Sequence, residues 1–293
     1  MISLYVAGII DVPKNIMKVA KRTKPRITAP LQGYDTEPKR LAQYAAMAYC
    51  DDKPIIRKTC GPCRRIDKLV VFKGIYETHL DALALMLVDH KRSNCIVPWS
   101  GFVEKLYKIN RVYKGSPWLF KNSSDAQDVR VHRGFKKTAD SLRDYILPEL
   151  KDVFREYKDY RLQLVGHSLG GAIATLMTII IHQEMKFPLS RISLTTYGQP
   201  RVGNYVFAKW FNSLPVTAIH VVNEDDPVPH LPGIWNGFSH IKGELYISSG
   251  ISISCPPGNE GLESSSCSNS RMPELGFNSH LRAWDINIST QGC

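Results

Sequence analysis

The sequence predicts a single α/β domain built on a mostly parallel β-sheet and preceded by a basic segment. Short apolar runs alternate with longer helical patterns along most of the chain, as in stacked βαβ units. Between residues 160 and 223 the order is strand, helix, strand, helix, strand, which implies parallel strands joined by right-handed crossovers. The 293 residues, 43% of them hydrophobic, suffice for one sizeable core. We expect the domain to span residues 37–293 and the basic segment residues 1–36.

The first half of the domain is expected to hold one alanine-rich helix, four strands and a long amphipathic helix. Pro98 lies inside the third strand and predicts either an edge strand or a distortion, because proline donates no hydrogen bond. Pro148 lies inside the long helix and is expected to kink it or split it in two. The expected helices cover 37–49 and 135–157, and the expected strands cover 68–73, 83–88, 95–102 and 129–131.

The second half contains the clearest alternation of strands and helices. The helix after the first of these strands is apolar on all sides, which predicts that it is buried. The expected strands cover 160–165, 191–198, 217–223 and 243–249, and the expected helices cover 170–185 and 204–214.

Ser168 is the candidate nucleophile. It lies in the sequence Gly166-His167-Ser168-Leu169-Gly170, where a strand passes into a helix, and this is the context of a nucleophile elbow. Small residues two positions before and after the serine allow the strand and the helix to pack closely. The helix N-terminus offers free N–H groups to a developing oxyanion. A serine alone is a poor nucleophile, so a base held by an acid must complete the site.

Chain order limits the partners of this serine to a few residues. In proteins with a nucleophile elbow the acid comes after the serine along the chain, and the histidine comes after the acid. The stretch 220–232 supplies a strand and then Asp225 and Asp226, so either is a candidate acid. His240 and His280 follow far enough along the chain to be candidate bases. Order alone does not choose within either pair.

Charge and cysteine content bear on the environment and the partners. The net charge is +11, and residues 1–40 hold eight basic against three acidic residues. We interpret residues 1–36 as the remnant of a signal or pro-segment, with a dibasic pair at 21–22. No nucleic-acid-binding motif occurs, so no nucleic-acid partner is expected.

The chain has seven cysteines, and their spacing is not that of a metal site. They predict structural disulfides in a secreted protein, and the odd number leaves at least one cysteine outside them.

Beyond about residue 37 the sequence resembles the fungal class 3 lipases, the family of the Rhizomucor and Thermomyces triacylglycerol lipases and of some feruloyl esterases. The resemblance implies an α/β-hydrolase fold, with helices on both faces of the sheet. It also implies that Asp226 is the acid and His280 the base, so that Ser168, Asp226 and His280 form the catalytic triad. The motifs that carry the resemblance are VHRGF (131–135), GHSLGGA (166–172), YGQPRVGN (197–204), NEDDPVPHLP (223–232), GFSHIKGELYI (237–247) and SHLRAWDIN (279–287).

The resemblance further implies three disulfides and an oxyanion hole. The implied pairs are Cys50–Cys293, Cys60–Cys63 and Cys255–Cys267, which leave Cys95 unpaired. The oxyanion donors are expected to be the backbone N–H groups of Leu169 and Phe102. The family usually carries serine or threonine where Phe102 stands, so one hydroxyl donor is replaced and weakened activity is expected. A one-residue shift would instead bring Ser100 to this place.

The resemblance also implies a lid directly after this donor; an ordinary surface helix is the alternative. Residues 103–114 have apolar side chains on one side and basic ones on the other, as in an amphipathic helix that favours anionic interfaces. We predict a secreted, monomeric triacylglycerol lipase that cleaves acylglycerol esters at an oil–water or membrane interface through an acyl-enzyme, without cofactor or metal. The alternatives are a soluble esterase or phospholipase of the same fold, or a weakly active or inactive relative that binds lipid.

Overall fold

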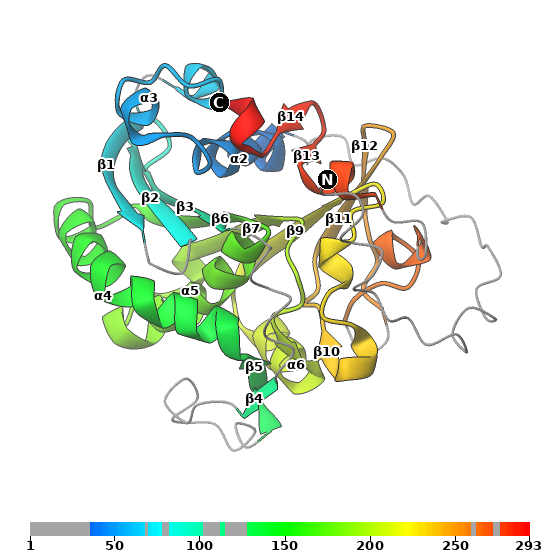
Figure 1. The fold of residues 1–293 in the computed structure, drawn as a ribbon. Coiled ribbons are helices and arrows are strands. Elements are labelled where there is room, and N and C mark those ends of the chain that lie inside the picture. Colours follow the sequence, from blue (N-terminus) through cyan, green and yellow to red (C-terminus); the bar gives the residue numbers. More distant parts are fainter. Residues whose placement is uncertain are drawn as a thin grey trace.

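The computed structural model describes residues 36–67, 70–77, 82–101, 112–114, 128–258, 262–271 and 276–293. Its centre is an eight-stranded sheet with the order β1-β2-β3-β6-β7-β9-β11-β12 (Figure 1). The pairs from β3 through β6, β7 and β9 to β11 are parallel, and the outer pairs are antiparallel. The mostly parallel sheet predicted from the alternating pattern is therefore present. The strands are β1 (Val70–Glu77), β2 (Ala82–Asp89), β3 (Asn94–Gly101), β6 (Arg161–His167), β7 (Ile192–Tyr197), β9 (Thr217–Asn223), β11 (Glu244–Ser248) and β12 (Ile251–Ser254).

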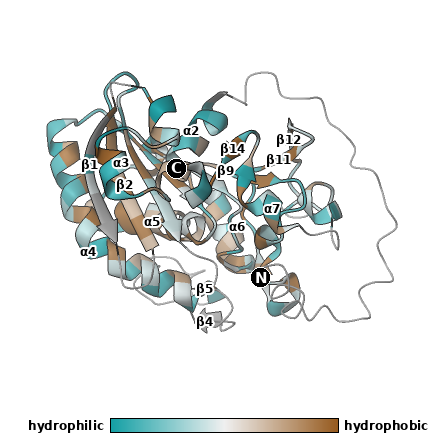
Figure 2. Cartoon of the chain, turned by 45° about the horizontal axis from the view of Figure 1, so that its top comes forward, coloured by the Kyte–Doolittle hydropathy of each residue, from teal (hydrophilic) through white to brown (hydrophobic). Residues whose placement is uncertain are grey.

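Helices cover both faces of this sheet. Helices α4 (Arg133–Glu156), α5 (Leu169–Met185) and α6 (Tyr205–Ser213) pack on one face, and α2 (Thr36–Met47) packs on the other (Figure 1). In Figure 2 hydrophobic colour concentrates on the inner strands and α5, whereas hydrophilic and hydrophobic residues alternate along α4. The pattern follows from burial, since every residue of α5 from Leu169 to Ile181 is buried and α4 is amphipathic.

Smaller elements connect these layers. A four-stranded sheet has the order β10-β8-β5-β4, and a two-stranded sheet joins β13 to β14. The short strands are β4 (Val112–Lys114), β5 (Arg130–His132), β8 (Gly203–Asn204), β10 (Phe238–Ser239), β13 (Arg282–Ala283) and β14 (Ile286–Asn287). The short helices are α3 (Asp52–Ile56), η2 (Pro62–Arg65), η6 (Leu189–Arg191), η7 (Val228–His230), η8 (Ile234–Asn236), η10 (Ser268–Arg271), α7 (Phe277–His280) and η11 (Thr290–Gly292).

For each of the two prolines the structure excludes one of the two expected outcomes. Strand β3 lies inside the sheet between β2 and β6, so Pro98 marks a distortion and not an edge: the register with β2 skips Val97 and Pro98. Helix α4 is not split at Pro148 but runs unbroken for 24 residues. Pro148 is exposed, and so is Asp144, whose carbonyl loses its helical partner, so water can satisfy that carbonyl.

The expected lid helix over 103–114 is wrong at its end, because Val112–Lys114 form β4 and pair with β5. The rest of that helix lies outside the described residues, as do Phe102, the dibasic pair at 21–22 and residues 1–35. The boundary between residues 36 and 37 stays a prediction. In the described parts of the chain no helix combines the length and apolar character needed to cross a bilayer.

Three disulfides join the cysteines in the expected pairs. Cys50–Cys293, Cys60–Cys63 and Cys255–Cys267 have Cα–Cα distances of 5.4, 4.9 and 6.1 Å. The first bridge joins the end of the α2 region to the C-terminal segment across 243 residues. Cys95 is the free cysteine; it is buried in β3, and burial raises the pKa of its thiol to about 12.

Candidate active site

Ser168 lies between β6 and α5 in a sharply turned backbone. Its φ and ψ are 55° and −127°, a conformation that costs energy for any residue with a side chain. The Ser168 N–H donates to the Tyr197 carbonyl at 2.9 Å, and the Ser168 carbonyl accepts from Gly171 N at 3.0 Å. A Cβ at Gly170 would lie 2.2 Å from the carbonyl oxygen of Trp99, so α5 can approach β3 only through a glycine. This is the close packing that the elbow motif predicts.

The structure brings Ser168, His280 and Asp226 together at the carboxyl edge of the parallel strands. His280 Nε2 lies 2.9 Å from Ser168 Oγ, and His280 Nδ1 lies 3.0 Å from both carboxylate oxygens of Asp226. All three residues are at most 2% exposed. With Nδ1–H donated to the carboxylate, Nε2 is left to accept the serine proton. His280 is the last residue of the short helix α7.

The acid is held from two sides. Asp226 Oδ1 accepts a hydrogen bond from Val228 N at 2.9 Å, at the start of η7. Gly198 follows β7 with φ +54°, and a Cβ there would lie 2.6 Å from Asp226 Oδ2 and 2.7 Å from His280 Nδ1. Gly198 thus leaves the space that the carboxylate–imidazole pair occupies.

The two candidate acids have different surroundings. The Asp225 carboxylate accepts a hydrogen bond from the hydroxyl of Ser279. Its backbone carbonyl accepts from Gly276 N at 2.8 Å. Asp225 therefore fastens the segment before His280, whereas Asp226 contacts the ring itself.

The other candidate base is used elsewhere. His240 Nε2 donates to the Gln199 carbonyl at 2.9 Å, and the ring stacks on His220 with centroids 4.4 Å apart. Burial, together with the nearby Arg201 charge, lowers the pKa of His240 to about 3. His240 is therefore a neutral core histidine.

A second hydrogen-bonded chain that sequence reasoning missed supports the base. The Tyr49 hydroxyl lies 2.6 Å from His167 Nδ1, and His167 Nε2 lies 2.7 Å from the carbonyl oxygen of His280. The carbonyl can only accept, so His167 carries its proton on Nε2 and Tyr49 donates to Nδ1. Burial, followed by the nearby His280, holds the pKa of His167 well below its usual value. Only the position of His167 beside the nucleophile hinted at this role.

One side of the oxyanion site is described. The Leu169 N–H is the first amide of α5, and the first amides of a helix have no partner within it. The last described residue of β3, Gly101, faces Leu169, since a Cβ there would lie 2.9 Å from the leucine side chain. The Ser100 hydroxyl donates to the Ala48 carbonyl at 2.7 Å, so its proton is already engaged there. Phe102, the other expected donor, lies outside the described residues.

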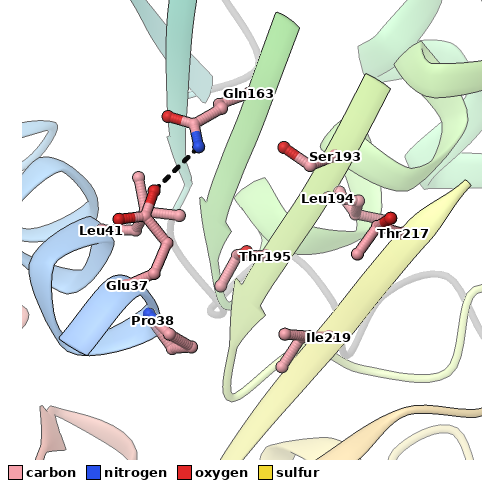
Figure 3. Close-up of a pocket in the computed structure, with 9 residues that line it drawn as sticks. All are labelled: Glu37, Pro38, Leu41, Gln163, Ser193, Leu194, Thr195, Thr217 and Ile219. Carbon is pink, nitrogen blue, oxygen red and sulfur yellow. Dashed lines mark hydrogen bonds between the residues drawn. The ribbon is translucent and has the colours of Figure 1, made fainter. Parts of the chain in front are cut away.

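A hollow of about 250 Å³ lies on the α2 side of the sheet, away from the triad (Figure 3). Glu37 and Gln163 are hydrogen-bonded across it at 2.9 Å. It lies toward the amino ends of β6, β7 and β9, the opposite edge from Ser168. Within the described ranges, the one group of three side chains with metal-ligand atoms is Glu244, Cys255 and Cys267, and both cysteines are in a disulfide. Neither the hollow nor this group of three side chains contributes a residue to the triad.

The known proteins to which this chain is similar are lipases. A family model described as "Lipase (class 3)" matches residues 100–235. The chain is 36% identical to a lipase of Rhizomucor miehei over 160 residues, 54% of this chain and 44% of that protein. It is 28% identical to secreted mono- and diacylglycerol lipase A of Penicillium cyclopium over 216 residues, 71% and 68% of the two chains. The solved triacylglyceride lipase of R. miehei superposes with a TM-score of 0.77 at 25% identity, over 89% of this chain and 98% of that one. The chain spans less than half the length of the first of these relatives.

Proposed function

Because a "Lipase (class 3)" family model matches residues 100–235 and the chain has the α/β-hydrolase fold of a solved lipase, we propose that it is a class 3 lipase, a serine hydrolase that cleaves carboxylic esters of acylglycerols. One observation carries the proposal. Ser168, His280 and Asp226 form a continuous hydrogen-bonded chain with distances of 2.9 and 3.0 Å, and all three are buried. Such a chain is the arrangement that makes a serine hydroxyl nucleophilic.

The proposed reaction has two halves. Ser168 Oγ attacks the ester carbonyl while His280 Nε2 takes its proton, and the imidazolium then gives that proton to the leaving alcohol. Water next attacks the acyl-enzyme, with His280 as base, and releases the fatty acid. Asp226 holds the imidazole in the tautomer that both halves need. Each step moves an acyl group or a proton between these side chains, substrate and water, so no cofactor enters the proposal.

We assign the oxyanion to the backbone N–H groups of Leu169 and Phe102. A full oxyanion donor contributes about 10²–10³ in turnover. If Phe102 supplies only its N–H, the serine hydroxyl introduced by Phe102→Ser should raise kcat on a soluble ester. An unchanged or lower kcat would show that the second donor is elsewhere.

The substrate is proposed to be a lipid ester presented at an oil–water or membrane surface, and the enzyme to be a secreted monomer. The three disulfides support an oxidising compartment, where such bonds persist. The relatives, which include lipases and a secreted mono- and diacylglycerol lipase, support the substrate class. A soluble esterase or phospholipase of the same fold would differ in chain-length and interface preference.

The test is hydrolysis of p-nitrophenyl butyrate, p-nitrophenyl palmitate and emulsified triolein by the wild type and by Ser168→Ala. Ser193→Ala is a matched control, because Ser193 is a half-buried serine of β7 beside the hollow in Figure 3. Activity that is lost in Ser168→Ala and retained in Ser193→Ala is expected. Equal activity of wild type and Ser168→Ala would refute the serine mechanism. Activity on butyrate with none on triolein would refute the lipase assignment in favour of an esterase.

A further inference from the structure

Arg201 is a buried arginine outside the triad, in the loop between β7 and β8. It is only 3% exposed. Its N–H groups donate to the carbonyls of three consecutive residues: the guanidinium Nη1 to His230 at 2.5 Å and to Pro232 at 3.1 Å, and the backbone N–H to Leu231 at 2.8 Å. Arg201 therefore holds the stretch 230–232 at every peptide carbonyl.

The other side of the guanidinium is fixed to a different part of the chain. Arg201 Nε lies 3.1 and 3.2 Å from the two carboxylate oxygens of Glu263, and Nη2 lies 3.1 Å from one of them. Nη2 also donates to Asn269 Oδ1 at 3.5 Å, and the same oxygen lies 3.1 Å from His230 Nδ1. Glu263 and Asn269 flank Cys267, which is disulfide-bonded to Cys255. The arginine thus joins the stretch 230–232 to a segment that is itself covalently fastened.

The stretch held by Arg201 is the end of the one-turn helix that holds the acid. Helix η7 begins at Val228, whose N–H donates to Asp226 Oδ1 at 2.9 Å, and it ends at His230, whose carbonyl accepts from Arg201. The turn closes through Leu231 N, which donates to the Val228 carbonyl at 3.0 Å. Three residues in one closed turn move together, so a shift at His230 reaches the N–H that orients the carboxylate.

We propose that Arg201 is a positioning residue for Asp226, acting through η7. The proposal rests on the proposed function, because it gives Asp226 its role in the triad. A planar guanidinium with five donors can serve His230, Pro232, Glu263 and Asn269 at once, whereas a lysine ammonium has three donors and no fixed fork. Arg201→Lys keeps the charge opposite Glu263 but cannot keep all these contacts, so the carboxylate is displaced while the site stays assembled.

The experiment compares Arg201→Lys with the matched control Arg191→Lys. Arg191 also donates to backbone carbonyls, those of Lys158 and Tyr160, but it lies just before β7 at the opposite edge of the sheet. Stopped-flow hydrolysis of p-nitrophenyl butyrate gives the burst amplitude, kcat and KM, and a fluorophosphonate probe gives the labelling rate of Ser168. We expect Arg201→Lys to lower kcat and the labelling rate by about ten- to a hundredfold, as for a misplacement of about 1 Å. The burst amplitude and KM should stay within twofold of wild type, and Arg191→Lys should change none of these quantities by more than twofold.

Two results would overturn the proposal: an Arg201→Lys enzyme with wild-type kcat, or one whose loss is entirely a lower burst amplitude matched by a lower folded fraction. If Arg201→Lys does not fold, Glu263→Gln tests the proposal in its place, because this variant keeps the arginine and removes the carboxylate that pairs with it. That variant should lower kcat at least threefold at full burst amplitude, and an unchanged kcat refutes positioning. A wild type that labels at Ser168 but hydrolyses no ester would refute the proposed function, and the labelling rates would still test Arg201.

Discussion

Gly198→Ala should strongly lower the proposed ester hydrolysis by displacing the acid–base pair of Asp226 and His280. The new Cβ would lie 2.6 Å from Asp226 Oδ2, 2.7 Å from His280 Nδ1 and 2.9 Å from His280 Cε1, where ordinary contact begins at 3.4 Å. The pair must therefore move by about 0.5–0.8 Å, and a misplacement of about 1 Å in a catalytic group costs about 10²-fold in rate. The substitution also carries a backbone cost of about 1–2 kcal/mol, since φ at this residue is +54°.

A matched variant separates the two effects. Gly250 has φ +77° in the hairpin between β11 and β12, and a Cβ there would have nothing within 4 Å. Gly250→Ala should therefore lose about 1–2 kcal/mol of unfolding free energy in urea with kcat unchanged. Gly198→Ala should lose a similar free energy and about 10²-fold in kcat on p-nitrophenyl butyrate. If the two variants have the same kcat to within threefold, the argument from contact distances is refuted.

Three further outcomes follow from the same structure. Asp226→Asn should lower kcat on the same ester by about 10⁴-fold, whereas Asp225→Asn should stay within about tenfold of wild type; equal losses would contradict the assignment of the acid. Opening Cys50–Cys293 by a double serine substitution should cost about 5.5 kcal/mol in urea unfolding, against about 2 for Cys60–Cys63, because loop entropy grows with the 243- and 3-residue separations. Burial raises the pKa of Glu244 to about 7, so its carboxyl binds a proton more tightly in the folded protein than in the unfolded chain. The free energy of unfolding should therefore decrease as the pH rises from about 4.5 to about 7. Glu244→Gln should remove this fall, on the order of 3 kcal/mol in pH-dependent urea unfolding, and an identical pH profile in both proteins would contradict it.

Much of the site could be anticipated because its signals are local. The elbow needs a strand, small residues and a helix in one short stretch, and all lie next to Ser168 in the sequence. The choice of Asp226 over Asp225 is not local. It depends on which carboxylate meets His280, 54 residues away, and which meets Ser279. Periodicity carries no information about such contacts, so only the family resemblance distinguished the two carboxylates.

The prolines show the opposite case, in which a local rule was outweighed by tertiary structure. Pro148 costs a helical hydrogen bond, but the apolar face of α4 is buried along its whole length against the sheet and α5, and the helix continues. Pro98 costs ladder bonds to β2, but β3 is buried at all eight positions and stays inside the sheet. The role of Arg201 could not be predicted from the motif that contains it, because its hydrogen-bond partners lie in two other loops.

The arrangement of the triad along the chain has a kinetic consequence. Ser168 Oγ meets His280 across 112 residues, and His280 meets Asp226 across 54. Contacts of such separation form late, because the entropy of closing the intervening loops must be overcome first. Helical signal should therefore return early during refolding, and esterase activity only when the last segment docks on the sheet. The recovery of the proposed ester hydrolysis would therefore report the completion of the fold.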